Sequence, residues 1–362
     1  MRLLVINPGS TSTKFGVFEQ AQEIFSQTIR HGSEFDSCPD LTSQSPLREQ
    51  LVCQALETRG IDPAGFDAIV GRGGLLHPLE GGVYLVNQAM IEDLASCRYG
   101  THASNLGGLI AAEIASRYGL KAYVADPVIV DEMDSLARIS GWPGMERRSV
   151  FHALNQKAVA RRYATEQGRA YEQLNLIIAH LGGGISVGAH KNGRVVDVNN
   201  ALGGDGPYSP ERSGGLPLFS VMDLCFSGQY QLDQLKKMFV GQGGLAAYLG
   251  TTDAVSIDQR IAKGDKDARL ILEGMAYQVA KEIGSAATVL EGAVDAIILT
   301  GGLAYDRYVV DWVTRRVRFI APVIVYPGED ELPALAQTVG KALAGHMAIK
   351  TYKKENPDDP TA

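Results

Sequence analysis

Short apolar runs separated by polar, glycine-rich turns recur along this chain of 362 residues. An apolar run at residues 3–6 enters a turn at residues 7–14 (NPGSTSTK), and a second apolar run follows at residues 15–18. β-Forming residues on both sides of a tight turn predict strand, loop and strand. Residues 23–29 provide a third short strand. A three-stranded unit is therefore expected at the start of the chain.

The same order of elements returns in the second half. Residues 176–181, 185–189 and 195–198 read as strands, with three glycines in the first turn and a Lys-Asn-Gly-Arg hairpin turn in the second. A second repeat is visible letter by letter, since FDAIVGRGGL at residues 66–75 matches VDAIILTGGL at 294–303 in six of ten positions. In each half the buried strand ending in Gly-Gly follows the three-stranded unit, which predicts two duplicated α/β lobes.

Helical periodicity, with apolar residues three to four apart, covers several further segments. The expected helices span residues 47–59, 88–96, 104–118, 130–140, 153–167, 218–226, 267–291 and 334–350. A short strand at residues 122–124 leads into Asp126-Pro127. Residues 353–362 are charged and contain proline, so we expect a tail.

Composition places the chain among soluble globular proteins of more than one domain. Hydrophobic residues make up 45% and charged residues 21%, and 362 residues exceed one ordinary core. A net charge of -7 argues against a nucleic-acid surface. Neither a signal peptide nor a run of membrane length is expected, which favours a cytoplasmic protein. The four scattered cysteines predict reduced thiols rather than a zinc site.

The turn at residues 7–14 carries chemistry suited to a polyphosphate. Its small residues leave backbone amides unshielded, its hydroxyls can bind oxygen or a metal, and Lys14 adds a positive charge. The P-loop spacing is absent. A serine- and threonine-rich hairpin turn without a ligand explains the same residues equally well.

Four other polar residues stand where strands end or glycines cluster. Arg72 interrupts a glycine turn, where a guanidinium can hold a carboxylate or phosphate through two hydrogen bonds. Asp126 ends a strand as a catalytic acid would, and equally as an ordinary Asp-Pro turn. His180 precedes three glycines whose bare amides favour a phosphate contact, although a lone histidine in a strand is usually a core residue. Arg212 lies in a long loop at residues 202–215, where it can act as an arginine finger.

The repeated unit resembles the actin, sugar-kinase and Hsp70 superfamily. That resemblance implies two ribonuclease H-like lobes, each a mixed β-sheet flanked by helices, with a nucleotide in the cleft between them. A single Rossmann-like sheet is the alternative, but the G-x-G-x-x-G fingerprint is missing.

Three motifs sharpen the resemblance to one family. NPGSTSTK at residues 7–14, HLGGG at 180–184 and SPERSG at 209–214 are similar to the ordered motifs of the acetate and butyrate kinases, the acetokinase family. The likeness runs over essentially the whole chain. HLGGGIS and GPYSPERSG resemble the butyrate kinase branch more than the acetate kinase branch, and so does the length.

The resemblance implies transfer of phosphate from ATP to a short-chain carboxylate, giving an acyl phosphate. A carboxylate is ionised at neutral pH, so positioning and charge neutralisation replace a general base. By resemblance, Arg72 holds the substrate, His180 and Arg212 stabilise the phosphoryl group in transit, and Asp126 orients Arg72 or a Mg²⁺-bound water. The implied phosphate, metal and adenosine contacts are Asn7, Ser10, Ser12, Lys14, Gly182, Gly183, Gly184, Gly301 and Gly302. By the same resemblance Asn7 contacts the metal, the metal-linked acid is Asp330 or Glu331, and His102 and His152 receive only peripheral roles.

The resemblance also predicts lobes at residues 1–128 with 328–362 and at 129–327. Assembly through the second lobe into a homodimer or higher oligomer is expected, with no nucleic acid and no membrane as partners. Acetate or propionate remains an alternative substrate to butyrate and its branched analogues. A sugar kinase using Asp126 as base is a rival, although Arg72 favours an anionic acceptor. An ATP-driven chaperone or filament subunit is another, but no segment is spare for a client domain.

Overall fold

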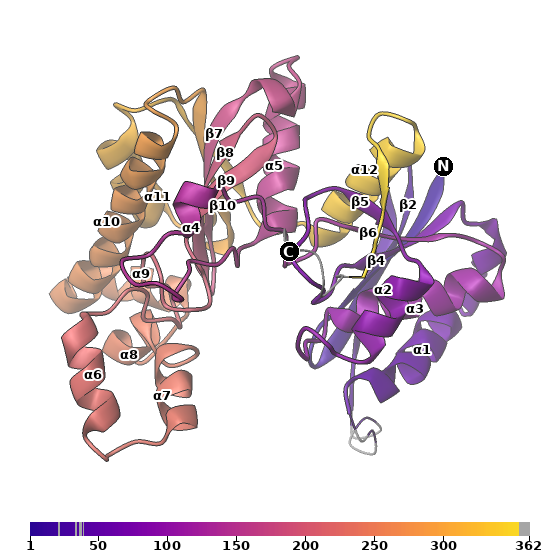
Figure 1. The fold of residues 1–362 in the computed structure, drawn as a ribbon, viewed down its shortest axis with the longest axis horizontal. Helices are drawn as coiled ribbons and strands as arrows, with labels where there is room; N and C mark the ends of the chain where they lie inside the picture. The colour runs from indigo at the N-terminus through magenta and orange to yellow at the C-terminus, as the bar shows by residue number, and fades with distance from the viewer. Residues whose placement is uncertain (21, 33–34, 36–37, 39, 355–362) are drawn as a thin grey trace. The chain divides into compact units, whose positions relative to one another are not determined.

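The computed structural model describes residues 1–354 except 21, 33–34, 36–37 and 39. The described chain divides into two compact units. The first unit runs from Met1 to Val130 and takes up the chain again from Asp330, and the second is Asp131–Glu329. Each unit is built around its own β-sheet (Figure 1).

The sheet of the first unit has seven strands in the order β12-β5-β6-β4-β1-β2-β3. Its strands are β1 (Arg2–Pro8), β2 (Ser12–Glu19), β3 (Gln22–Arg30), β4 (Ala68–Arg72), β5 (Val83–Leu85), β6 (Ala122–Ala125) and β12 (Ile349–Thr351). Strands β1, β2 and β3 form the predicted antiparallel unit, and β4 and β6 continue the sheet parallel to β1. The sheet is therefore mixed, as predicted.

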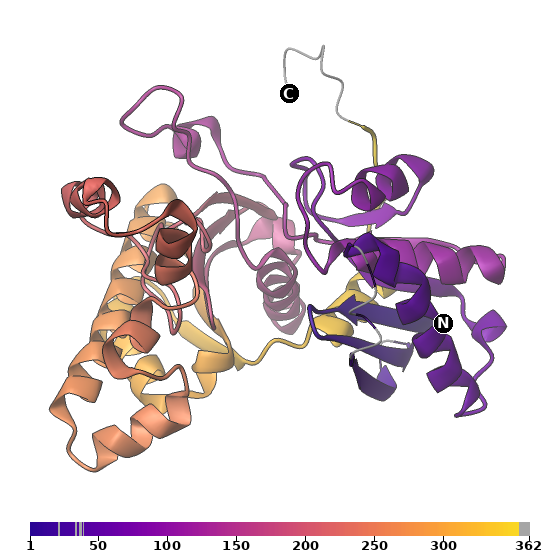
Figure 2. The same cartoon turned by 90° about the horizontal axis from the view of Figure 1, so that it is seen from below.

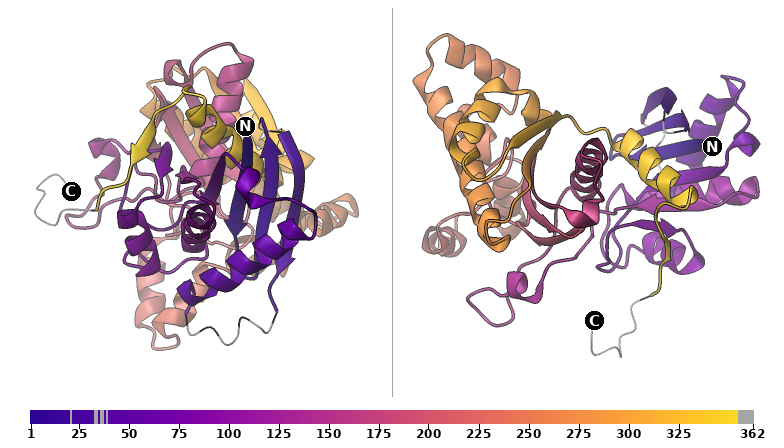
Figure 3. Two further views of the ribbon diagram at one scale, coloured as in Figure 1. Left: turned by 90° about the vertical axis from the view of Figure 1, so that its right-hand side faces the viewer. Right: turned by 90° about the horizontal axis from the view of Figure 1, so that it is seen from above.

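Helices cover both faces of this sheet. Successive side chains of each strand point to opposite faces, and on both faces they are largely apolar and buried. The helices are α1 (Ser45–Glu57), α2 (Gln88–Ala95), α3 (Asn105–Arg117) and α12 (Glu331–Leu343). Leu4 and Ile6 pack with the core of α1 and α3, whereas α12 packs on the other side, with Leu332 against Gly16. The two views in Figure 3 show α12 and α3 on opposite faces.

The second unit repeats this plan with a five-stranded sheet in the order β11-β10-β7-β8-β9. Its strands are β7 (Asn175–Leu181), β8 (Ile185–Lys191), β9 (Arg194–Val198), β10 (Ala296–Gly301) and β11 (Val323–Pro327). Its helices are α4 (Ser135–Arg138), α5 (Ala153–Glu166), α6 (Leu218–Phe226), α7 (Leu232–Phe239), α8 (Gly244–Leu249), α9 (Ala254–Ala262), α10 (Lys266–Val289) and α11 (Arg307–Val317). Short 3-10 turns complete the described structure at Thr42–Gln44, Pro63–Gly65, Tyr171–Gln173 and Gly302–Tyr305.

The side chains of these strands also point alternately to the two faces of the sheet, and different helices cover the two faces. Ile178 and Ile298 face α5, which Figure 2 shows almost end-on against the sheet. Ile177 and Leu299 face the long helix α10 and its neighbour α11. Burial on both faces explains why these strands are continuous apolar runs rather than alternating ones.

The strand registers confirm the predicted duplication. Ala68 pairs with Leu3, and its counterpart in the letter-by-letter repeat, Ala296, pairs with Leu176. Counting along both strands makes Asn7 equivalent to His180. By the same register Arg72 corresponds to Thr300, so the repeat conserves backbone positions while the side chains differ.

Two predicted helices differ from the structure. The helix expected at residues 130–140 is reduced to α4, because the carboxylate of Asp131 accepts from the backbone amide of Met133 and is held by Arg138 at 2.6 Å. The helix expected at 334–350 begins at Glu331 and ends at Leu343, where the chain turns through Gly345 at a φ of 81° and then forms β12. Of the predicted tail, residues 355–362 lie outside the described residues.

A pair of carboxyl groups on α9 and α11 links stability to pH. Asp306 caps α11 by accepting from the amide of Val309 at 3.1 Å, and Asp258 on α9 contacts it. Asp258 Oδ1 and Asp306 Oδ2 are buried and find no donor among the described residues, which a shared proton would satisfy. Burial, with a smaller effect from Asp258, raises the pKa of Asp306 to about 6.

We therefore expect the free energy of unfolding to fall as pH rises from about 4 to about 6. A raised folded-state pKa contributes stability that is complete below the unfolded pKa and is lost as pH passes the folded pKa. Asp306→Asn keeps a capping side chain and removes this loss, which stabilises the protein at pH 7.5 by on the order of 1–3 kcal/mol. Urea unfolding of the wild type and the variant at pH 5 and pH 7.5 measures this difference in the free energy of unfolding.

Asp265→Asn is the matched control. Asp265 caps α10, but hydrogen bonds from the Ala268 amide and from Arg260 hold the pKa of its carboxyl below the usual range. This variant should gain no stability at pH 7.5. Equal gains in both variants would contradict a role for the Asp258–Asp306 pair.

Candidate active site

The turn between β1 and β2 closes on itself and leaves its tip exposed. The amide of Gly9 donates to the carbonyl of Ser12 at 2.7 Å. Asn7 and Lys14 are paired across the two strands. Ser10 and Lys14 are exposed, and Ser12 is half-buried. The predicted phosphate contacts of the first half therefore lie together on one short hairpin.

Arg72, at the end of β4, grips a carboxylate in this same unit. Its Nη2 lies 3.0 Å from Glu331 Oε1 and its Nη1 lies 3.1 Å from Glu331 Oε2. Nη1 also donates to Asn7 Oδ1 at 3.3 Å, and the Asn7 amide group donates to Glu331. Parallel pairing of β1 with β4 explains why Asn7 and Arg72 meet at one sheet edge.

The structure distinguishes the two acids that the sequence left open. Glu331 is the first residue of α12 and points to Asn7 and Arg72, whereas Asp330 precedes the helix, is exposed and makes no side-chain capping hydrogen bond. Of the two, Glu331 is the acid placed beside Asn7.

Asp126 directly follows the residue that pairs with Arg72, and it is almost completely buried. It adopts a φ of 39°, which is uncommon for a residue other than glycine. Its Oδ1 accepts from the amide of Gly82 at 2.8 Å, and its own amide donates to the Gly82 carbonyl at 3.0 Å. These contacts fix the loop before β5 at the end of β6.

His102 lies closer to this cluster than its predicted peripheral role implied. Its Nδ1 is 2.7 Å from Ser104 Oγ. Although part of the ring is exposed, partial desolvation lowers the pKa of His102, and the charge of Arg72 adds a smaller effect. Both effects favour the neutral form of the imidazole.

In the second unit, His180 ends β7 with only 1% of its surface exposed. Its Nδ1 lies 2.8 Å from Asn155 Oδ1, and its ring stacks on His152 with centroids 3.7 Å apart. Its Nε2 lies 3.0 Å from Glu329 Oε1, in a geometry that makes no hydrogen bond. The Nε2 of a firmly oriented ring therefore faces the Glu329 carboxylate but has no hydrogen bond within the described chain.

The second and third motifs form one structure. Ser209 Oγ donates to the Gly183 carbonyl and accepts from the amide of Arg212 at 3.1 Å. The Arg212 guanidinium passes over Gly184, where a Cβ would lie 2.0 Å from Nη1, and donates to the Ala201 carbonyl at 2.7 Å. Burial lowers the pKa of Arg212 below its usual range. Gly184 is thus required for Arg212 to occupy this position.

Gly301 and Gly302 have different reasons to lack side chains. Gly301 has a φ of 88°, and a Cβ there would meet the Leu181 carbonyl at 2.4 Å. Gly302 is exposed, and a Cβ there would meet nothing within 4 Å. Intramolecular packing therefore explains the first glycine but not the second.

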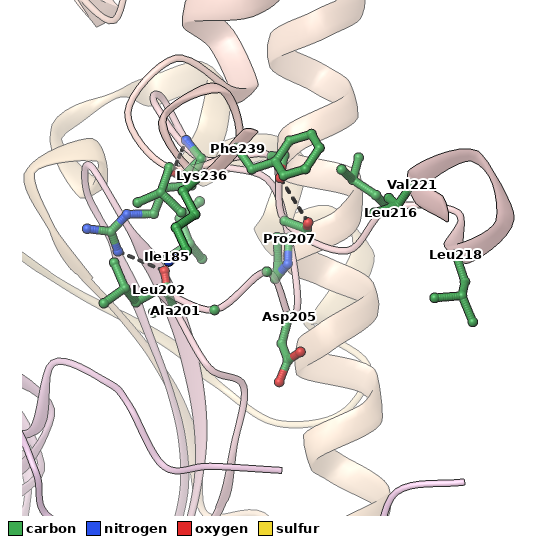
Figure 4. Close-up of a pocket in the computed structure, with 17 residues that line it drawn as sticks. Ile185, Ala201, Leu202, Asp205, Pro207, Leu216, Leu218, Val221, Lys236 and Phe239 are labelled. Atoms are coloured by element: carbon green, nitrogen blue, oxygen red, sulfur yellow. Dashed lines mark hydrogen bonds between the residues drawn. The ribbon is translucent and has the colours of Figure 1, made fainter. Parts of the chain in front are cut away.

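A cavity of about 510 Å³ lies beside Arg212 (Figure 4). Apolar side chains including Leu216, Val221 and Phe239 line it, and Figure 4 shows Leu218 directed away from its centre. Lys236 and Arg212 supply positive charge. The cavity separates α6 from the strands of the second unit.

The comparisons with known proteins assign the family. Residues 144–320 match the model of the Acetokinase family. Butyrate kinase 2 of Clostridium acetobutylicum is 52% identical over 353 residues, which are 97% of this chain and 99% of that protein. The chain belongs to the acetokinase family. The predicted family is thereby confirmed over nearly its whole length.

Solved structures of this family share its fold. Acetate kinase of Porphyromonas gingivalis matches with a TM-score of 0.78 at 19% identity, over 93% of this chain and 98% of that one. A propionate kinase from Francisella tularensis matches with a TM-score of 0.71 at 19% identity, over 93% and 99%. The predicted fold class, two duplicated actin-like lobes with mixed sheets, is confirmed. Among the described residues, no helix is long and apolar enough to cross a bilayer.

Sequence reasoning missed two residues of this site, Asn155 and Glu329, and gave His152 only a peripheral role. Asn155 orients His180, His152 stacks on it, and Glu329 Oε1 lies 3.0 Å from its Nε2. His152 and Asn155 stand three apart at the start of α5, a spacing that places both on one helix face. That spacing could have indicated the pair, whereas nothing in the sequence indicates Glu329.

We expect Gly301, the last residue of β10, and Gly302, which follows the strand, to respond differently to alanine. Gly301→Ala should lower the free energy of unfolding by roughly 2–4 kcal/mol, because it combines a backbone clash with a left-handed φ. Gly302→Ala should leave it within about 0.5 kcal/mol. Gly284→Ala, in α10 with open space around it, is the control and should be neutral or slightly stabilising. Chemical denaturation that finds Gly302→Ala as costly as Gly301→Ala would contradict this assignment.

Proposed function

We propose that the protein transfers the γ-phosphoryl group of ATP to a short-chain carboxylate, reversibly and by direct in-line displacement. The observation that carries the proposal is the two-pronged hold of Arg72 on the Glu331 carboxylate. It supports the proposal because the fork of this guanidinium, at the end of β4, already pairs with a carboxylate. Membership of the acetokinase family supports the same reaction.

The nucleophile in this reaction needs no general base. A carboxylate is ionised at neutral pH, so the protein has to align it and neutralise charge on the phosphoryl group. We assign alignment to Arg72 and charge neutralisation to Arg212 and His180. Asn155 and His152 hold the His180 ring in place, which leaves its Nε2 to contact a phosphoryl oxygen.

ATP is the phosphoryl donor in this proposal. Ser10, Ser12 and Lys14 of the first turn and Gly182–Gly184 of the second supply hydroxyls, amides and charge for its phosphates. Gly301 and Gly302 receive the adenosine. Because an added methyl at Gly302 would meet no protein atom, loss of ADP affinity in Gly302→Ala would report on the nucleotide alone.

Mg²⁺ is proposed as the accompanying ion. Among the described residues, no group of three or more histidine, cysteine or acidic side chains could enclose a metal. The Asn7 side chain and the Glu331 carboxylate lie in contact and fit an ion that takes few protein ligands and keeps phosphate oxygens and waters. Such an ion would neutralise charge between the phosphates.

Butyrate or a branched analogue is the proposed substrate, on the strength of the relative named butyrate kinase 2. Acetate and propionate are the alternatives within the family. A hydroxyl-directed sugar kinase would need Asp126 as its base. Asp126 is 1% exposed and accepts the Gly82 amide, which suits an orienting role better.

We further propose that copies of this chain associate through α6, and that the protein works in the cytoplasm. Every residue of α6, which the structure describes in full, is at least partly exposed. Leu218, Phe219 and Phe226 expose 68%, 78% and 87% of their surface. An exposed apolar helix of this kind marks an association surface.

Acyl-phosphate formation tests the proposed reaction. With Mg·ATP and C2–C6 acids, hydroxylamine trapping should peak at C4, and Arg72→Ala should lower kcat/KM by about 10²–10³. Arg72→Lys keeps the charge without the fork and should recover little. Arg59→Ala, an exposed arginine of the same unit, is the control. A peak at C2 would move the substrate to acetate, and no hydroxamate with any acid would refute the carboxylate kinase.

Light scattering after size-exclusion chromatography tests the association surface. Phe219→Lys should shift the protein from oligomer to monomer, because a desolvated ammonium opposes burial of this patch. Phe319→Lys replaces an equally exposed phenylalanine outside α6 and should leave the mass unchanged. An unchanged mass in both variants would rule α6 out.

A further inference from the structure

The side chain of Arg48, on α1, is among the largest that the first unit buries completely. It is 1% exposed, although arginine is almost never fully buried unless it is paired with an acid. Within the described part of the chain, Arg48 forms no ion pair. The contacts of its guanidinium therefore have to explain why the charge is there.

All of these contacts are to neutral oxygen atoms. Three are backbone carbonyls of the turn after β1, belonging to Gly9 at 2.8 Å, Ser12 at 3.3 Å and Ser10 at 3.4 Å. Thr13 Oγ1 accepts at 3.2 Å, and Gln44 Oε1 accepts from Nε at 3.2 Å and from Nη2 at 2.7 Å. The donors of the guanidinium are thus engaged, but none of the described atoms that they touch carries a negative charge.

The charge persists under physiological conditions. Burial lowers the pKa of Arg48 to about 10, which still leaves the guanidinium protonated at neutral pH. The ring of Phe35 lies 5.5 Å from the guanidinium carbon and adds a cation–π contact. A full positive charge is therefore fixed directly behind the turn.

The same contacts orient the turn. In a trans peptide the carbonyl of one residue and the amide of the next point in opposite directions. Arg48 draws the carbonyls of Gly9 and Ser10 inward, so the amides of Ser10 and Thr11 point outward. Both residues are exposed, and neither amide donates a hydrogen bond to any described part of the chain.

We propose that Arg48 is a positioning residue for polyphosphate binding: it turns the amides of Ser10 and Thr11 toward the phosphate oxygens and supplies an unneutralised charge behind them. This inference rests on the proposed function and deepens it. Arginine suits the role because its planar fork reaches several carbonyls at once, whereas lysine has three donors around one point. Gln44 holds the fork from the helix side.

The inference is tested by measuring the affinities of three probes by calorimetric titration. The probes are inorganic tripolyphosphate, ADP and adenosine. Arg48→Lys and Arg48→Gln should weaken tripolyphosphate and ADP binding tenfold or more, while adenosine affinity and the KM for the carboxylate stay unchanged. A general loss of structure would weaken the binding of adenosine as well. Arg59→Lys, at an exposed arginine just past the end of α1, is the control. Tripolyphosphate affinity within twofold of the wild type in both Arg48 variants would overturn the inference.

Two further measurements keep the inference open to refutation if the Arg48 variants do not fold. Gln44→Leu retains Arg48 but removes the acceptor on one side of its guanidinium. This variant should bind tripolyphosphate two- to fivefold more weakly, with no change in adenosine affinity. In the wild type, tripolyphosphate should shift the ¹⁵N–¹H resonances of Ser10 and Thr11. A protein that forms acyl phosphate but shows no shift of these amides overturns this inference alone. A wild type that binds none of the probes overturns it together with the proposed function.

Discussion

Parallel pairing between two particular strands of each unit determines where the chemistry of this protein can lie. β1 pairs with β4 and β7 pairs with β10, so the carboxyl ends of each pair share one sheet edge. In the first unit Asn7 and Arg72 lie at this edge of the sheet. In the second unit His180 lies at the equivalent edge of its own sheet. Helices cover both faces of each sheet and hold the registers fixed, since a slip by one residue would move every side chain from one packed face to the other.

Much of this arrangement could be predicted from the sequence because it is encoded locally. The repeat at residues 66–75 and 294–303, the polar turns and the helical periodicities each depend on neighbouring residues. What escaped prediction depends on distant ones. Glu331 is distinguished from Asp330 only by reaching Asn7 and Arg72, more than 250 residues earlier in the chain, and His152 enters the site only by stacking on His180. The helix expected at 130–140 fails because Asp131 binds Arg138 and a backbone amide instead of continuing a helix.

Among the described residues, two cations are almost completely buried, Arg48 and Lys157, and Arg212 is half-buried. Lys157 is as buried as Arg48 but meets Glu132 at 2.8 Å, so its charge is neutralised where it lies. Arg48 and Arg212 are held by backbone carbonyls, and within the described chain neither forms an ion pair. A buried positive charge that has no acidic partner lowers the stability of the protein without ligand, and a bound anion offsets that cost. This difference separates residues that stabilise the fold from residues that prepare a site.

The contact between Gly184 and Arg212 also limits how this sequence can change over time. The guanidinium occupies the space that any side chain at position 184 would need. A side chain at position 184 and this placement of the guanidinium therefore exclude one another. The two positions, 28 residues apart in the sequence, are coupled through space, so the effect of a substitution at one depends on the residue at the other.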